Sequence, residues 1–144
     1  MNITNLKENA ATVEKQSDRT QVMIVAGKSA LRTQLVNLVE GQFNFEVCAQ
    51  AENISQVTKA FQKTQIDFAI ICTPAKDQQS DELAKKIKFE RPDLPLLFFS
   101  TSQLSVAAHT LDQKDADQIV EAIHYIENLL KNNIFGFAVL VNIE

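Results

Sequence analysis

The stretch IDFAIICTP, residues 66–74, constrains the fold most strongly, because its centre is apolar without interruption. Residues 68–71 show no alternation with polar side chains. A short run of this kind is typical of a strand buried on both faces of a parallel sheet, with helices on either side. The carboxyl end of such a strand is where an open α/β sheet places its ligands. At that end the chain offers Cys72, Thr73 and Pro74, and no carboxylate.

The length of 144 residues fits one domain with a substantial core. A net charge of -4 and scattered basic residues argue against direct nucleic-acid binding, because such surfaces cluster Lys and Arg. No apolar run approaches the roughly 20 residues of a membrane span, and no signal peptide opens the chain. Cys48 and Cys72 both fall in predicted buried strands, which is typical of core packing in a reducing compartment. We therefore expect a cytoplasmic protein that does not contact a membrane.

Short apolar strands and amphipathic helices alternate along most of the chain. Leu31, Leu35 and Leu38, for example, share one face of a helix that Gly41 ends. Four strands that alternate with helices indicate a parallel sheet with right-handed crossovers. The predicted strands cover residues 21–26, 45–50, 66–74 and 96–99, and the predicted helices cover residues 30–40, 54–61 (capped by Asn53 or Ser55), 80–90 (capped by Ser80) and 115–131.

Residues 1–20 are polar and carry only a few apolar residues, at a loose helical spacing. This pattern predicts a short helix or a mobile N-terminal arm. Residues 21–144 are then expected to form a single α/β domain.

The segment that follows Ser100 allows two interpretations. In one of them, residues 105–111 form a short strand; in the other, residues 102–111 form a short helix. We favour the helix, because a parallel crossover needs about a dozen residues. Residues 135–143, FGFAVLVNI, then form the fifth strand. In the alternative they are an extra strand at an exposed edge, which invites pairing with another chain.

With these elements placed, the chain resembles a response-regulator receiver domain over about residues 20–130. The resemblance rests on FNFEVCAQAEN (43–53), RPDLPLLFFST (91–101) and DADQIVEAI (115–123). It implies the flavodoxin-like (CheY-like) α/β fold, a three-layer sandwich around a mostly parallel five-stranded sheet of order 2-1-3-4-5, altered here after the fourth strand. It also implies a role in bacterial signalling or transcription control.

The positions that correspond to the family's phosphorylation site depart from its pattern. The resemblance implies an acidic pair that binds Mg²⁺ after the first strand, where this chain has Ala26 and Gly27. Magnesium needs oxygen ligands, which these residues do not supply from side chains. Cys72 stands in place of the aspartate that accepts phosphate, Ser100 retains the switch hydroxyl, and Asp112 falls where the family has a lysine. We therefore expect a pseudo-receiver that is not an enzyme and uses no metal or cofactor.

The same edge of the predicted sheet holds a candidate anion or ligand crevice, formed by Gly27, Lys28, Ser29, Cys72 and Thr73. A helix N-terminus attracts anions, but the chain lacks the further glycine of a phosphate-binding P-loop, so a tight turn is the simpler interpretation. A reactive Cys72 would need a lowered pKa, with Lys28 as the source of charge. A buried, inert thiol is the alternative that we favour. The two histidines do not add a candidate site, because neither has the spacing to other residues that a metal or catalytic site requires.

Three hypotheses about function follow. The leading one is a non-catalytic, phosphorylation-independent domain that docks to a protein partner or to a second copy, as a homodimer. The second is a ligand- or redox-sensing module that uses the crevice near Cys72. The third is a phosphorylatable receiver with relocated acidic residues. For the first hypothesis, the candidate association surface consists of Ile126, Leu130, Phe135, Phe137, Val139 and Val141.

Overall fold

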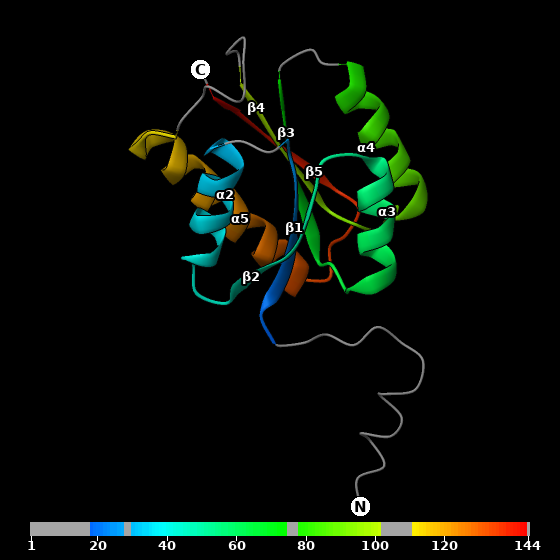
Figure 1. The fold of residues 1–144 in the computed structure, drawn as a ribbon. Coiled ribbons are helices and arrows are strands. Elements are labelled where there is room, and N and C mark those ends of the chain that lie inside the picture. The colour runs from blue at the N-terminus through cyan, green and yellow to red at the C-terminus, as the bar shows by residue number, and fades with distance from the viewer. Residues whose placement is uncertain (1–17, 28–29, 75–77, 102–110, 144) are drawn as a thin grey trace, which may run out of the picture.

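The fold is a parallel sheet that lies between two layers of helices. The computed structural model describes residues 18–27, 30–74, 78–101 and 111–143. Strands and helices alternate through these ranges (Figure 1). In chain order the elements are β1 (Thr20–Val25), α2 (Ala30–Glu40), β2 (Phe45–Ala51), α3 (Ile54–Lys63), β3 (Phe68–Pro74), α4 (Gln78–Glu90), β4 (Leu96–Thr101), α5 (Gln113–Lys131) and β5 (Ala138–Ile143).

The centre of the sheet is β3, whose residues 68–71 are completely buried. It pairs with β1 on one side and with β4 on the other. All the strand pairs are parallel, and the strand order is β2-β1-β3-β4-β5. The predicted strand order and the prediction of a central strand buried on both faces are therefore confirmed.

Two helices cover each face of the sheet (Figure 1). On one face, Leu31 of α2 and Ile123 of α5 share a core cluster with Phe68 of β3. On the other face, Val57 of α3 and Ile87 of α4 belong to a second core cluster. Because side chains alternate along a strand, β3 contributes to both clusters, and the two layers depend on the same strand.

The helix ends follow the local sequence. Asn53 caps α3, and its side chain accepts a hydrogen bond from the N–H of Gln56 at 3.0 Å, which confirms one of the two predicted caps. Asp112 caps α5 through a capping box with Asp115. The predicted cap at Ser80 is wrong, because α4 begins two residues earlier, at Gln78, and Ser80 lies inside the helix.

The C-terminal segment forms the edge strand β5, which pairs in parallel with β4 from Ala138 opposite Leu96 onward. The interpretation in which this segment takes the fifth position of the sheet is confirmed. The strand begins three residues later than predicted, because Gly136 has a positive φ of 75° that interrupts the extended backbone. The helix predicted over residues 102–111 lies almost wholly outside the described residues, as do residues 1–17.

The last crossover has the opposite hand to the other three. From β1 to β2 the chain steps in one direction across the sheet, with α2 on one face. From β4 to β5 it steps in the opposite direction, but α5 lies on that same face (Figure 1). Since about 98 % of parallel crossovers are right-handed, the crossover through α5 is the left-handed one. The right-handed crossovers expected for the first four strands do not extend to this connection.

The amphipathic α5 is apolar only on the face that meets the sheet, where Ile119, Ile123 and Ile126 are buried. The other helices of the described ranges are shorter. None of the helices in these ranges is long and apolar enough to cross a membrane.

Truncation of Ile126 is expected to destabilise the fold, because its side chain is fully buried between α5 and the sheet. The variant Ile126→Ala should lower the free energy of unfolding by about 2–5 kcal/mol, measured by urea denaturation. Phe89→Ala is the matched control, because Phe89 is 88 % exposed on α4, and its change should stay within about 0.5 kcal/mol. Equal effects of the two variants would contradict this packing.

Candidate functional site

The ends of β1, β3 and β4 meet at the carboxyl edge of the sheet. This edge therefore brings together Ala26, Cys72 and Ser100, three of the positions that the resemblance predicts as a degenerate phosphorylation site. The registers that place them there pair Val25 with Ile71 and Thr73 with Ser100. The backbone thus brings these three positions to one edge of the sheet, and their side chains decide the chemistry there.

The end of β1 supplies no acidic side chain to this edge. Ala26 is buried, and its carbonyl oxygen accepts a hydrogen bond from Arg32 Nη1 at 3.2 Å. Gly27 is exposed, and a Cβ atom added there would meet nothing within 4 Å. Lys28 and Ser29 lie outside the described residues, so the anion crevice that includes them stays a prediction. The nearest cation that the structure describes is thus the guanidinium of Arg32.

The Cys72 thiol has the environment of a core residue. It is almost completely buried, and this burial raises the pKa of the thiol from 9.0 to about 12. A thiol with this pKa carries almost no thiolate near neutral pH, and the thiolate is the reactive form. Burial also raises the pKa of Cys48, to about 11, and its Sγ lies 3.5 Å from the carbonyl oxygen of Val22. Both thiols therefore fit core packing.

Two carboxylates of the described residues, Asp112 and Asp67, bind backbone N–H groups. Asp112, which falls where the family has a lysine, caps α5, and Oδ1 accepts the N–H of Asp115 at 2.8 Å. Asp67 lies at the opposite edge of the sheet, before β3, where Oδ2 accepts the N–H of Gln21 at 2.7 Å. Within the described ranges, no group of three or more His, Cys, Asp or Glu residues could hold a metal ion.

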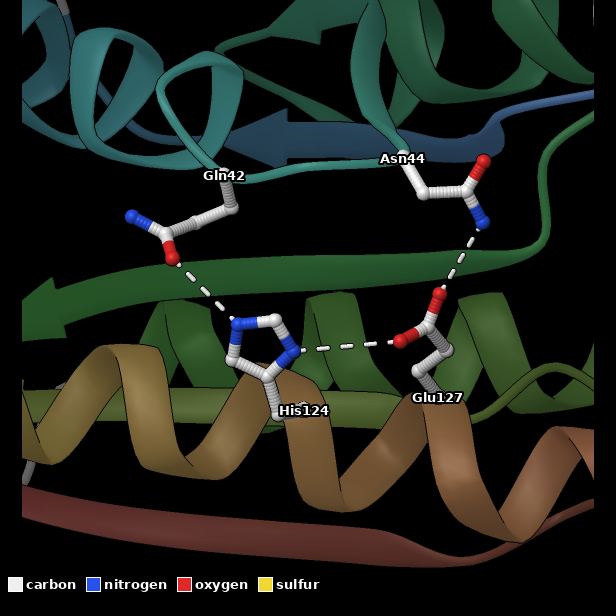
Figure 2. Close-up of polar contacts among 4 residues, drawn as sticks. All are labelled: Gln42, Asn44, His124 and Glu127. Atoms are coloured by element: carbon white, nitrogen blue, oxygen red, sulfur yellow. Dashed lines mark hydrogen bonds and ion pairs between the residues drawn. The ribbon is translucent and has the colours of Figure 1, made fainter.

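A polar cluster joins α5 to the turn between α2 and β2 (Figure 2). His124 Nε2 lies 3.3 Å from Gln42 Oε1, and Gln42 Nε2 donates to the carbonyl of Leu38 at 3.4 Å, which fixes the orientation of the amide. Asn44 Nδ2 donates to Glu127 Oε2 at 3.1 Å, while Glu127 Oε1 lies 3.8 Å from His124 Nδ1. These contacts hold α5 against the turn between α2 and β2.

A groove of about 410 Å³ lies elsewhere, between α5 and the edge strand β5. Its lining combines apolar residues of both elements with the polar residues Gln118 and Glu121. Tyr125 is 55 % exposed and Leu140 is 61 % exposed, so both offer apolar surface to solvent. The lining residues are Gln118, Glu121, Ala122 and Tyr125 of α5 and Val139, Leu140 and Val141 of β5.

The structure changes the membership of the predicted association surface. Ile126 is fully buried and cannot contribute to any surface. Phe135 is 54 % exposed and remains a candidate. The other predicted members are only partly buried and pack against the core cluster under α2 and α5; they are Leu130, Phe137, Val139 and Val141.

Sequence reasoning missed Tyr125 and Leu140 as exposed apolar residues beside the last strand. The signal for Leu140 is the alternation of a strand, since Val139 and Val141 face the core under α5 and the residue between them must face the other way. Treating residues 135–143 as one uniformly apolar segment concealed that alternation. Tyr125 is next to the buried Ile126 on α5, so the helical period places it at the boundary of the apolar face.

The comparisons with known proteins show the fold. No protein-family model and no characterised protein sequence matches the chain. A two-component response regulator of the LuxR family from Aurantimonas sp. SI85-9A1 is 19 % identical, with 75 % of this chain and 84 % of that chain covered and a TM-score of 0.60. The signal receiver domain of an HD domain-containing protein from Pseudomonas fluorescens Pf-5 is 14 % identical, with 87 % and 97 % covered and a TM-score of 0.61.

A third solved structure agrees with these two. The response regulator domain of Thermotoga maritima CheB is 18 % identical, with 76 % of this chain and 97 % of that chain covered and a TM-score of 0.57. The chain therefore has the flavodoxin-like, CheY-like fold that receiver domains share, as its sequence pattern predicts.

Thiol labelling tests the environment of Cys72. A thiol reagent at pH 8 should leave Cys72 unmodified in the native protein and modify it after unfolding in denaturant, because burial raises its pKa to about 12. The folded pKa lies above the unfolded one, so the protonated thiol contributes stability that is fully present below about pH 9 and is lost as the pH rises toward 12.

The variant Cys72→Ala assigns the labelled thiol, since Cys48 is then the only remaining cysteine. Rapid loss of the Cys72 thiol in the native protein would contradict the buried environment and would favour the redox-sensing hypothesis.

Proposed function

We propose that this chain is a non-catalytic regulatory domain that acts through protein–protein contacts and takes no phosphate on aspartate. The observation that carries the proposal is the side-chain content of the carboxyl edge, where Ala26, Gly27 and Cys72 occupy the positions of the acidic residues. The similar structures are receiver and response-regulator domains from bacteria, which supports a role in bacterial signalling or transcription control.

The chemistry of phosphoryl transfer explains why these substitutions matter. The reaction depends on positioning and on charge neutralisation, which a metal ion held by carboxylates supplies. Ala26 has a methyl group and Gly27 has no side chain, so neither can bind Mg²⁺ through an oxygen of its side chain. The buried, protonated Cys72 thiol replaces the carboxylate nucleophile. The site has therefore lost the metal ligands and the nucleophile together.

The surface beside β5 is the best candidate for protein contacts among the described residues. Tyr125 is exposed beside the groove between α5 and β5, Leu140 is exposed on the other side of β5, and Phe135 is exposed just before the strand. A few side chains supply most of the binding energy in protein interfaces, and tyrosine is one of the residue types most often among them. A redox-sensing function receives no comparable support, because Cys72 is buried and its thiol pKa is raised.

Incubation with acetyl phosphate and Mg²⁺, followed by intact-mass measurement, tests whether the chain accepts phosphate. We expect no gain in mass, while an ordinary receiver domain treated in parallel gains one phosphoryl group. A stable gain of one phosphoryl group on this chain would contradict the proposal. If that gain persisted in Cys72→Ala, a relocated carboxylate would be the acceptor, as the third hypothesis requires.

A further inference from the structure

The handedness of the last crossover suggests that a second copy of the chain can supply the β5 strand that completes the sheet. The connection from β4 through α5 to β5 is left-handed, whereas a right-handed path is the rule for about 98 % of parallel crossovers. The rule applies to strands joined within one chain. If β5 came from a second copy, the sheet would keep the same strand order and no chain would contain the left-handed crossover.

The segment between α5 and β5 has the properties of a hinge. It covers only residues 132–137, and two of these residues have positive φ angles, Asn133 at 61° and Gly136 at 75°. A Cβ atom at Gly136 would lie 3.1 Å from the carbonyl oxygen of Pro92, so the backbone passes close to its neighbour. Short connections favour the exchange of an element between copies, because they limit how the element can return to its own sheet.

The contacts of β5 are made mainly with two elements, β4 and α5, which makes the strand separable from the rest of the fold. It pairs with β4 along its whole length, and Val139 and Val141 pack toward α5. An identical strand from a second copy would make the same hydrogen bonds and the same packing. The exchange therefore costs no native contact inside either sheet.

The hinge also carries apolar side chains that an exchanged dimer would cover. Ile134 is 45 % exposed and Phe135 is 54 % exposed, although both lie in a short loop. In an exchanged pair the two hinges cross near the two-fold axis, where an element from each copy faces its equivalent. Burial of these side chains against each other would add apolar contact that the monomer lacks.

We propose that the partner of this domain is a second copy of the same chain, and that the two copies exchange β5 through the 132–137 hinge. The proposal rests on the proposed function in that it names the protein partner. Phe98 and Leu140 are opposite each other in the β4–β5 register, so they report directly on which chain supplies β5.

The double variant Phe98→Cys/Leu140→Cys, oxidised gently in the folded state, distinguishes the two arrangements. We expect a covalently linked dimer on a non-reducing gel, because the two introduced thiols that face each other come from different chains. A disulfide that forms within one chain and leaves a monomeric mass would overturn the proposal. Each single variant is the control, and it should stay monomeric on the gel.

Two further outcomes are separated by these controls. A linked dimer from Leu140→Cys alone would show that two β5 edges lie side by side without exchange, which also overturns the proposal. Lengthening the hinge with Gly-Ser residues after Asn133 should shift the solution mass from dimer to monomer, measured by light scattering, because a longer connection lets β5 return to the sheet of its own chain. A monomeric mass for the unmodified chain would overturn exchange while leaving the acetyl phosphate result, and hence the proposed function, unaffected.

Discussion

Burial of β3 on both faces is the constraint on which the rest of the structure depends. Residues 68–71 contribute to the core clusters of both faces, so the two helical layers are coupled through one strand. The same burial extends to Cys72 at the end of the apolar run, where it raises the pKa of the thiol to about 12. A residue that completes the core in this way is poorly placed to act as a nucleophile. Stability of the sheet and the raised pKa of the Cys72 thiol therefore have one physical cause.

The two edge strands of the sheet differ in how readily a strand from another chain could pair with them. At the β2 edge, the N–H of Val47 donates to Glu40 Oε2 at 3.4 Å, and the register with β1 shifts between Val22 and Met23. Side-chain blocking and irregular register both discourage pairing with another strand. The β5 edge has the sequence AVLVNI without a charge or proline, and Leu140 is exposed on it. This asymmetry supports the proposal that association involves the β5 side of the molecule.

Much of the fold could be predicted from sequence, because apolar periodicity reports burial directly. The central strand, the α2 boundaries and the Asn53 cap follow from local patterns of this kind. Local patterns do not predict which face of the sheet α5 covers, because that face depends on the handedness of the crossover from β4 to β5. The general preference for right-handed crossovers predicts the wrong face here. Ile126 was likewise misplaced on the surface, because a helix pattern alone cannot say how deeply its apolar face is covered.

The candidate site could be predicted as an absence of carboxylates, since residue identities at strand ends are visible in the sequence. The environment of Cys72 and the exposure of Tyr125 could be determined only from the structure.

The central proposal is that the carboxyl edge of the sheet does not bind the metal ion that phosphoryl transfer needs. A Mg²⁺ titration followed through the amide chemical shifts of Gly27 and Cys72 tests it most directly. The account predicts no saturable shift at either residue, and a saturable shift at both in the millimolar range would contradict it.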